Sequence, residues 1–413
     1  MCKRFFLTFI VLILTFGPNV AEGRNESSLL PKPKGQYAIG TQKFFLTDST
    51  RKESFIIRRK YRELYIKMWF PVEVSGELEY EYFLGDYPTE VVSGIFKAVG
   101  LDKELVNEIK STTTNSVKGG LEPLGKDLFP VVIFNPGFYF GMADFYTSMA
   151  ENLASHGFIV CSINHPYEQP YVEQSGKNAK MKKKKAQLAY LQLYLMENFR
   201  KLELETDEQI VAGTRLYLKK LSRFDKTVRR WTADNEAFID YLHYVCNSDS
   251  ASALFRRMDI NNIGLMGQSI GGAVAGQVCL DNPDRIAAGI NLDCFQFGDM
   301  IDKPLEVPFM LMETEHYEIW RMGNSVVYRN VADDFYKFTI KGAKHFIYSD
   351  AAILDLIERE EQIKMIGDVD GAEANALINS YILAFFSKYL QGNTDDTLFE
   401  AVDNEQYKFL KIK

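Results

Sequence analysis

Short apolar runs, separated by longer stretches with helical periodicity, predict an α/β protein. Residues 130–134 (PVVIF) and 158–163 (FIVCSI) are apolar at nearly every position, which is typical of parallel strands buried on both faces. Further runs of this kind lie at residues 263–266, 289–292, 309–312 and 335–340. Because helical patterns separate these runs, we expect a mostly parallel central sheet flanked by helices.

The region before these runs has a different pattern. Residues 63–70 alternate between apolar and polar side chains, as a half-buried strand does, and residues 41–47 are a suitable partner strand. Between residues 83 and 128 the pattern is mixed, with helical stretches near 91–98 and 103–109. We expect all of these elements to belong to the same α/β domain.

A helical insertion is predicted at about residues 166–245. Residues 186–204 carry leucines at helical spacing, and residues 228–246 form a second long helical pattern. We interpret this interval as helices inserted over one end of the sheet. A final helix is predicted over residues 374–390, with Gly392 at the position where glycine commonly ends a helix.

The N-terminal residues have the pattern of a secretory signal peptide. Lys3 and Arg4 precede twelve uncharged residues, 5–16, and Gly17 and Pro18 then break any helix. An N-terminal membrane anchor is the alternative, but a spanning helix needs about 20 apolar residues. We therefore expect a secreted protein, periplasmic if bacterial. The expected organisation is a signal peptide at 1–22, a linker at 23–35, the α/β domain at 36–392 and a tail at 393–413.

Composition and charge exclude several classes of protein. The chain has 413 residues, of which 46% are hydrophobic and 25% charged, and its net charge is −7. These values exclude bulk disorder and argue against a general nucleic-acid-binding protein. The five cysteines form no C-x-x-C pair and no zinc-type spacing with histidine, so we expect buried free thiols and no metal site.

A cluster of six lysines lies within residues 177–185, beside the helical pattern of the insertion. Runs of like charge are usually solvent-exposed, so a solvated loop is the simpler interpretation. The alternative is a surface that meets an anionic membrane.

The residues most indicative of chemistry are Gly267, Gln268, Ser269 and Gly271, which form a G-x-S-x-G sequence. This sequence follows a short apolar strand and opens a helix of small residues, which is the context of a nucleophile elbow. Such an elbow places a serine hydroxyl above the edge of the sheet, and the glycines allow close packing at the turn. We therefore predict that Ser269 is a nucleophile.

A serine nucleophile needs a base, and the α/β-hydrolase order places the histidine after the acid. His345 follows the strand at residues 335–340 and is the preferred base, whereas His316 follows an earlier strand. An acid must orient the imidazole. Asp293, Glu313 and Glu315 all follow strands, and spacing alone does not choose among them.

Two backbone amides should stabilise the oxyanion that forms when serine attacks a carbonyl group. One is expected from Ile270, the residue after the nucleophile. The other is expected from Phe138, because Gly137 allows the loop after residues 130–134 to turn inward. We predict an aromatic substrate pocket, whose candidate residues are Tyr139, Phe140, Phe295, Phe297, Trp320 and Phe346.

Several segments together resemble the plasma-type platelet-activating-factor acetylhydrolases, the group VII phospholipases A2, and their bacterial relatives. In chain order the similar segments are residues 37–40 (YAIG), 62–65 (RELY), 69–71 (WFP), 153–160 (LASHGFIV), 267–272 (GQSIGG), 290–293 (INLD) and 341–345 (KGAKH). The resemblance extends from about residue 35 to residue 392.

This resemblance implies an α/β-hydrolase fold and calcium-independent hydrolysis of short or oxidised sn-2 acyl esters of phospholipids, with no cofactor. It assigns Asp293 as the acid, alongside Ser269 and His345, and places the oxyanion amides at Phe138 and Ile270. Relatives commonly carry histidine where Gln268 stands, which leaves the substrate preference open.

Two alternative functions fit the same scaffold. The first is a carboxylesterase for other small esters or polyesters, similar to dienelactone hydrolases or cutinases. The second is a catalytically silent lipid-binding protein, which the intact set of Ser269, Asp293 and His345 argues against. The expected partners are an ester or phospholipid substrate and, transiently, a membrane or lipoprotein surface.

Overall fold

The computed structural model describes residues 30–400, apart from 57–59, 75–76, 103, 119–124, 126, 198–205, 250, 316–317, 332–333 and 355. The expected signal peptide, most of the expected linker and the last residues of the tail lie outside the described residues, as does His316. Within the described ranges, no helix is long and apolar enough to cross a membrane.

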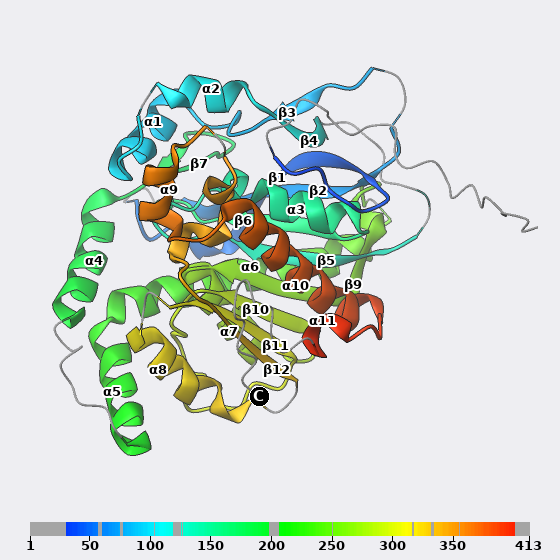
Figure 1. Cartoon of the computed structure of the whole chain (residues 1–413). Helices are drawn as coiled ribbons and strands as arrows, with labels where there is room; N and C mark the ends of the chain where they lie inside the picture. The colour runs from blue at the N-terminus through cyan, green and yellow to red at the C-terminus, as the bar shows by residue number, and fades with distance from the viewer. Residues whose placement is uncertain are drawn as a thin grey trace, which may run out of the picture.

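The centre of the molecule is a ten-stranded sheet in the order β12-β11-β10-β9-β5-β6-β2-β1-β4-β3 (Figure 1). Its strands are β1 (Ala38–Lys52), β2 (Tyr61–Val72), β3 (Tyr80–Tyr82), β4 (Thr113–Lys118), β5 (Phe129–Asn135), β6 (Ile159–Asn164), β9 (Met258–Gln268), β10 (Ala288–Leu292), β11 (Phe309–Thr314) and β12 (Phe335–Ile340). The six strands β5, β6 and β9–β12 are mutually parallel, while β2 pairs antiparallel with both β1 and β6. The predicted mostly parallel sheet is confirmed.

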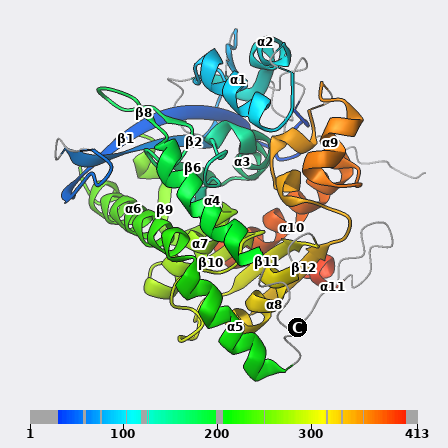
Figure 2. The same ribbon diagram turned by 90° about the vertical axis from the view of Figure 1, so that its left-hand side faces the viewer.

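Helices cover both faces of this sheet (Figures 1 and 2). The first layer contains α1 (Thr89–Ala98), α2 (Leu105–Ser111), α3 (Thr147–Ser155), α9 (Arg359–Ile366) and α10 (Gly371–Gln391), followed by the short α11 (Thr397–Glu400). The second layer contains α4 (Lys183–Glu197), α5 (Asp207–Lys220), α6 (Ser222–Cys246), α7 (Ile270–Asp281) and α8 (Glu318–Val327). Helix α10 corresponds to the helix predicted at 374–390 and ends as expected, with Gly392 in a left-handed conformation. It is not the final helix, because α11 follows it.

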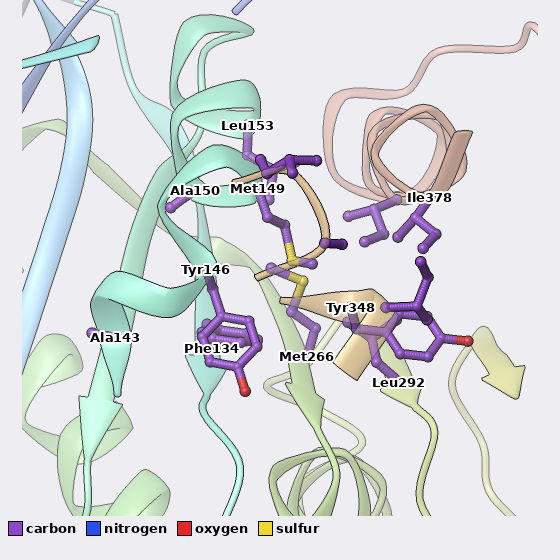
Figure 3. Close-up of a cluster of buried hydrophobic side chains, with 14 of the residues drawn as sticks. Phe134, Ala143, Tyr146, Met149, Ala150, Leu153, Met266, Leu292, Tyr348 and Ile378 are labelled. Carbon is purple, nitrogen blue, oxygen red and sulfur yellow. The ribbon is translucent and has the colours of Figure 1, made fainter. Parts of the chain in front are cut away.

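The apolar strands alternate their side chains between these two layers, as a sheet buried on both faces requires. In β5, Val132 and Phe134 belong to the core under the first layer, whereas Val131 and Ile133 belong to the core under the second. Figure 3 shows the first of these cores, where Phe134, Met266 and Leu292 of three neighbouring strands face side chains of α3 and α10.

The interval predicted as a helical insertion contains α4, α5 and α6, and also a two-stranded hairpin that the pattern did not indicate. The hairpin consists of β7 (Tyr171–Val172) and β8 (Ala179–Lys180). The helical pattern between the apolar runs at 130–134 and 158–163 corresponds to two elements, because residues 143–146 form a 3-10 turn before α3 begins. The short strands β3 and β4 were not predicted, and they extend the sheet beyond β1.

Candidate active site

Ser269 stands at a sharp turn between β9 and α7, as the nucleophile elbow requires. Its backbone has φ 55° and ψ −135°, a conformation that a non-glycine residue adopts only under strain. The turn depends on two glycines, since a Cβ on Gly267 would lie 2.2 Å from the backbone of Gly271 and one on Gly271 would lie 2.0 Å from the carbonyl oxygen of Asn135. The predicted sharp turn is therefore possible because Gly267 and Gly271 have no side chains that would clash with the turn itself and with Asn135 of β5.

Asp293 and His345 lie in contact at the same edge of the sheet. Asp293 directly follows β10 and has φ 58°, and its backbone amide donates to the carbonyl oxygen of Met312 on β11 at 2.8 Å. Its Oδ2 atom lies 2.7 Å from Nδ1 of His345. Its Oδ1 atom accepts a 2.8 Å hydrogen bond from the amide of Thr314. The carboxylate is therefore held in one orientation while it faces the imidazole.

The other two acids considered from sequence are engaged elsewhere. Glu313 is buried, lies 2.8 Å from Nζ of Lys337 and accepts a hydrogen bond from Asn324 at 3.0 Å. Burial raises the pKa of Glu313, although Lys337 opposes this shift. Glu315 accepts a hydrogen bond from the amide of Gly342 at 3.0 Å. Of the three candidates, Asp293 is the one whose carboxylate meets His345.

The two candidate oxyanion donors lie on adjacent segments. Ile270 is the first residue of α7, and Phe138 belongs to the loop after β5. In the described part of the chain, neither backbone N–H donates a hydrogen bond to another residue. Gly137 allows the close approach of this loop to the elbow, because a Cβ there would lie 2.7 Å from Oε1 of Gln268. Both segments and Ser269 border a shared cavity.

A buried polar cluster supports the loop from below, and the sequence pattern gave no signal for it. The side chain of Asn135, at the end of β5, contacts Asn235 at 2.7 Å and Nε2 of His165 at 3.1 Å. His165 lies 2.8 Å from Asp234, and its ring stacks on Trp231 with centroids 3.8 Å apart. Burial lowers the pKa of His165 to about 4, so this histidine is neutral and structural at neutral pH.

Two cavities meet at Ser269 and His345. The larger has a volume of about 300 Å³, and its apolar wall includes Phe140 and Phe346. The smaller, of about 80 Å³, is lined by Phe138, Ile270, Phe297 and Trp320 among others. Four of the six predicted pocket aromatics therefore border a cavity that also contains Ser269.

The remaining two predicted pocket residues, Tyr139 and Phe295, line neither cavity. Tyr139 has φ 73° and packs against Tyr190, with ring centroids 5.3 Å apart. Phe295 is 1% exposed and packs against Phe297, which lines the smaller cavity. Both side chains pack behind residues that line the cavities.

The described side chains include no cluster suited to a metal ion. No group of three or more histidine, cysteine, aspartate or glutamate residues is arranged to hold one in those ranges. Unpaired thiols are present at Cys161, Cys246, Cys279 and Cys294. Burial raises the pKa of each of these four thiols. A raised thiol pKa makes a reactive thiolate scarce, which fits a structural role.

A parallel sheet with helices on both faces and a serine at a strand-to-helix elbow defines an α/β-hydrolase. A search of solved structures agrees on the fold. A ferulic acid esterase from Streptomyces cinnamoneus superimposes with a TM-score of 0.70 and 22% sequence identity, covering 94% of this chain and 100% of the esterase chain.

The family follows from the sequence comparisons. The sequence model described as "Platelet-activating factor acetylhydrolase, isoform II" matches residues 22–407, so the chain belongs to this family. The platelet-activating factor acetylhydrolase of Cavia porcellus is 23% identical over 379 residues, covering 87% of this chain and 78% of the relative. That of Gallus gallus is 22% identical over 414 residues, covering 92% and 89%. The predicted family and fold are confirmed, and the protein is a carboxylic ester hydrolase.

Proposed function

We propose that the protein is a secreted serine esterase that hydrolyses short or oxidised sn-2 acyl esters of phospholipids. One observation carries this proposal: two apolar cavities meet at Ser269 and His345. At the same place, His345 contacts Asp293. An ester has an acyl arm and an alcohol arm, and two cavities that share one serine can receive them on opposite sides. The larger cavity is at the small end of the range for ligand pockets, which favours a short acyl chain.

The proposed mechanism assigns one role to each group. His345 takes the proton from Ser269 as the hydroxyl oxygen attacks the ester carbonyl, and Asp293 stabilises the imidazolium. The amides of Phe138 and Ile270 bind the oxyanion. The leaving alcohol takes the proton from His345, and water then hydrolyses the acyl-enzyme by the reverse route. The names of the relatives, which act on platelet-activating factor, favour an acetylated phospholipid as the first substrate to test.

Contact with a lipid surface is part of the proposal. Helix α4 exposes an apolar face made of Leu188, Leu191, Tyr194 and Leu195, whose exposed fractions are 44%, 49%, 67% and 58%. Exposed lysines stand at the start of the same helix. An apolar face beside cationic residues suits attachment to an anionic lipid surface. Tyr190 of α4 also lines both cavities, so this face lies beside the candidate active site.

Labelling with a fluorophosphonate probe tests the catalytic part of the proposal. We expect the wild-type protein to be labelled and Ser269→Ala not to be. Ser325→Ala is the matched control, because Ser325 is an exposed serine whose hydroxyl donates to its own helix at Met322. Equal labelling of wild type and Ser269→Ala, or no labelling of either, would contradict the assignment of the nucleophile.

Substrate profiling tests the lipid part separately. Phosphatidylcholines with short and with long sn-2 chains are compared with a soluble ester that has the same short acyl group. Preferential cleavage of the short-chain phospholipid is expected. Labelling at Ser269 without cleavage of any phospholipid would reduce the function to that of a general carboxylesterase.

The surface contact has its own test. Leu191→Ser should lower hydrolysis of vesicle lipid several-fold and leave hydrolysis of a soluble ester unchanged. Leu128→Ser is the control, because Leu128 is 57% exposed but precedes β5, at the end of that strand opposite to the loop that carries Phe138. Equal effects of the two substitutions would remove α4 from the proposal.

Secretion rests on the N-terminal pattern, which lies outside the described residues. N-terminal sequencing of protein recovered outside the cells tests it, and cleavage near residue 22 is the expected result. Retention of the full N-terminus on a membrane fraction would favour an anchor instead.

A further inference from the structure

A third cavity, separate from the two ester cavities that meet at Ser269, lies between α4, α6 and the turn at Tyr167 and Glu168. Its volume is about 160 Å³. We call it the basic hollow, because its charged lining residues are Glu168, Lys182, Lys185, Arg223, Lys226 and Arg230. Five of these residues are cationic and one is acidic, in a chain whose net charge is −7.

The one acid in the basic hollow is already occupied. Glu168 is buried and accepts hydrogen bonds from Nε1 of Trp231 and the hydroxyl of Thr227, each at 2.9 Å. It also pairs with Arg230 at 3.2 Å. Among the described residues, Lys182, Lys185, Arg223 and Lys226 pair with no carboxylate. The described residues therefore leave an excess of positive charge in the hollow.

Aromatic rings hold three of the cations close together at this site. Nζ of Lys185 lies 4.2 Å from the ring centre of Phe55, and the guanidinium of Arg230 lies 4.8 Å from the same ring. Lys182 lies over Tyr167 at 5.4 Å, and this ring in turn stacks on Phe55. Cation–π contacts offset part of the repulsion between neighbouring cations. The positive groups are thus arranged around one concave space before any ligand is present.

We propose that the basic hollow binds a phosphate group. A phosphate offers several strong acceptor oxygens and at least one full negative charge, which matches a concave site with arginine and several lysines. Phe138 lines this hollow as well as both ester cavities, and α4 contributes residues to all three. The bound phosphate would therefore sit on the far side of Phe138 from Ser269. This proposal does not depend on which ester the enzyme hydrolyses.

The lysine run offers a matched pair of variants. Lys182→Gln/Lys185→Gln removes two charges from the basic hollow, whereas Lys183→Gln/Lys184→Gln removes two exposed charges from the same run that do not line it. Binding of inorganic phosphate to the full mature chain is followed by ³¹P NMR at constant ionic strength. We expect saturable binding that Lys182→Gln/Lys185→Gln weakens by about tenfold and the control pair leaves unchanged. Absence of saturable binding, or equal weakening by both pairs, would overturn the proposal.

A second experiment distinguishes binding of a lipid phosphate from binding of a soluble phosphate compound. Sedimentation with vesicles of phosphatidylcholine and phosphatidylglycerol is measured for both pairs, with inorganic phosphate or chloride at equal ionic strength. If lipid phosphate enters the hollow, free phosphate releases the protein from the vesicles, and this release is lost in Lys182→Gln/Lys185→Gln but kept in the control pair. If free phosphate binds the hollow without releasing the protein from the vesicles, the site serves a soluble phosphate compound. Because neither experiment measures hydrolysis of an ester, failure of the proposed phospholipase activity leaves both results interpretable.

Discussion

The side-chain amide nitrogen of Gln268 lies 3.1 Å from Nε2 of His345 and 3.3 Å from the carbonyl oxygen of the same residue. A chain of hydrogen bonds sets this orientation, because the amide of Gly137 donates to the hydroxyl of Tyr146 at 3.4 Å and that hydroxyl donates to Oε1 of Gln268 at 3.0 Å. In the proposed mechanism, Nδ1–H of His345 is donated to Asp293, and the lone pair on Nε2 accepts the proton of Ser269. Gln268 would then compete with the proposed nucleophile for its base.

Replacement of Gln268 by methionine removes this competition while keeping a side chain of similar length. A net hydrogen bond is worth about 1 kcal/mol, so Gln268→Met should accelerate labelling of Ser269 by about two- to tenfold. The measurement is the second-order rate constant with a fluorophosphonate probe, which does not depend on the natural substrate. Tyr146→Phe should have a smaller effect in the same direction. A slower reaction in Gln268→Met would show that the glutamine orients His345 instead of restraining it.

The assignment of the acid can be tested with two neighbouring carboxylates. Asp293→Asn should lower kcat by about 10⁴-fold, because the imidazole loses the charge that orients and stabilises it. Glu313→Gln should retain activity in the folded fraction but lower the free energy of unfolding by about 3–5 kcal/mol, since Lys337 is left buried without its partner. Kinetics and urea unfolding of both variants separate these effects. The reverse pattern would transfer the role to Glu313.

Gly137 should be required for oxyanion stabilisation. Gly137→Ala places a Cβ 2.7 Å from Oε1 of Gln268 and 3.4 Å from Cβ of Ser269, and we expect the loop that carries the Phe138 amide to shift away. We expect kcat to fall by about 10²-fold, as on loss of one oxyanion donor, with little change in binding of the substrate. Gly94→Ala is the control, because a Cβ at this position in α1 meets no atom within 4 Å. Full activity of Gly137→Ala would contradict this prediction, because it would mean that the Gln268 side chain yields while the loop keeps its position.

Asp350 should make stability depend on pH. Burial raises the pKa of Asp350 to about 8, although hydrogen bonds from Ser148 oppose this shift. Because the folded value lies above the unfolded one, the stabilisation is complete below about pH 4 and is lost as the pH rises through about 8. Burial also raises the pKa of the neighbouring Glu151 to about 7, so this residue adds a loss of the same sign.

Urea unfolding of Asp350→Asn against wild type checks the contribution of Asp350. The variant should lose less stability than wild type between about pH 5 and about pH 8, and the remaining slope should reflect Glu151. Asp249→Asn, at an exposed position after α6, is the control and should follow wild type. If the free energy of unfolding changes with pH in the same way for Asp350→Asn and wild type, Asp350 is already ionised in the folded protein.

Local sequence signals were sufficient for the central sheet and for the elbow. A strand buried on both faces needs an unbroken apolar run, and the G-x-S-x-G turn needs its glycines within five consecutive residues, so both are visible in short windows. The strands β3 and β4 were missed because three to six residues of mixed polarity carry no periodicity. The β7–β8 hairpin was missed for the same reason.

The choice of acid depended on which strands are neighbours, and the sequence order does not specify this. Asp293 meets His345 because β10 lies between β9 and β11, so that Thr314 of the next strand can hold the carboxylate. The aromatic residues show the same limit. Phe140 reaches the larger cavity while the adjacent Tyr139, with its positive φ, turns toward Tyr190. The direction of a side chain in a loop is set by packing partners that lie far away in the sequence.

The position of β12 at the edge of the sheet has a consequence for biosynthesis. The proposed nucleophile, acid and oxyanion amides all precede residue 300, whereas His345 follows β12, which pairs with β11 alone. In a nascent chain that has not yet released the residues after 300 from the ribosome, the proposed nucleophile and acid would therefore lack the proposed base. Under the proposed mechanism, hydrolytic competence would require the edge strand to dock. Probe labelling would then count only the molecules in which this last step of folding is complete.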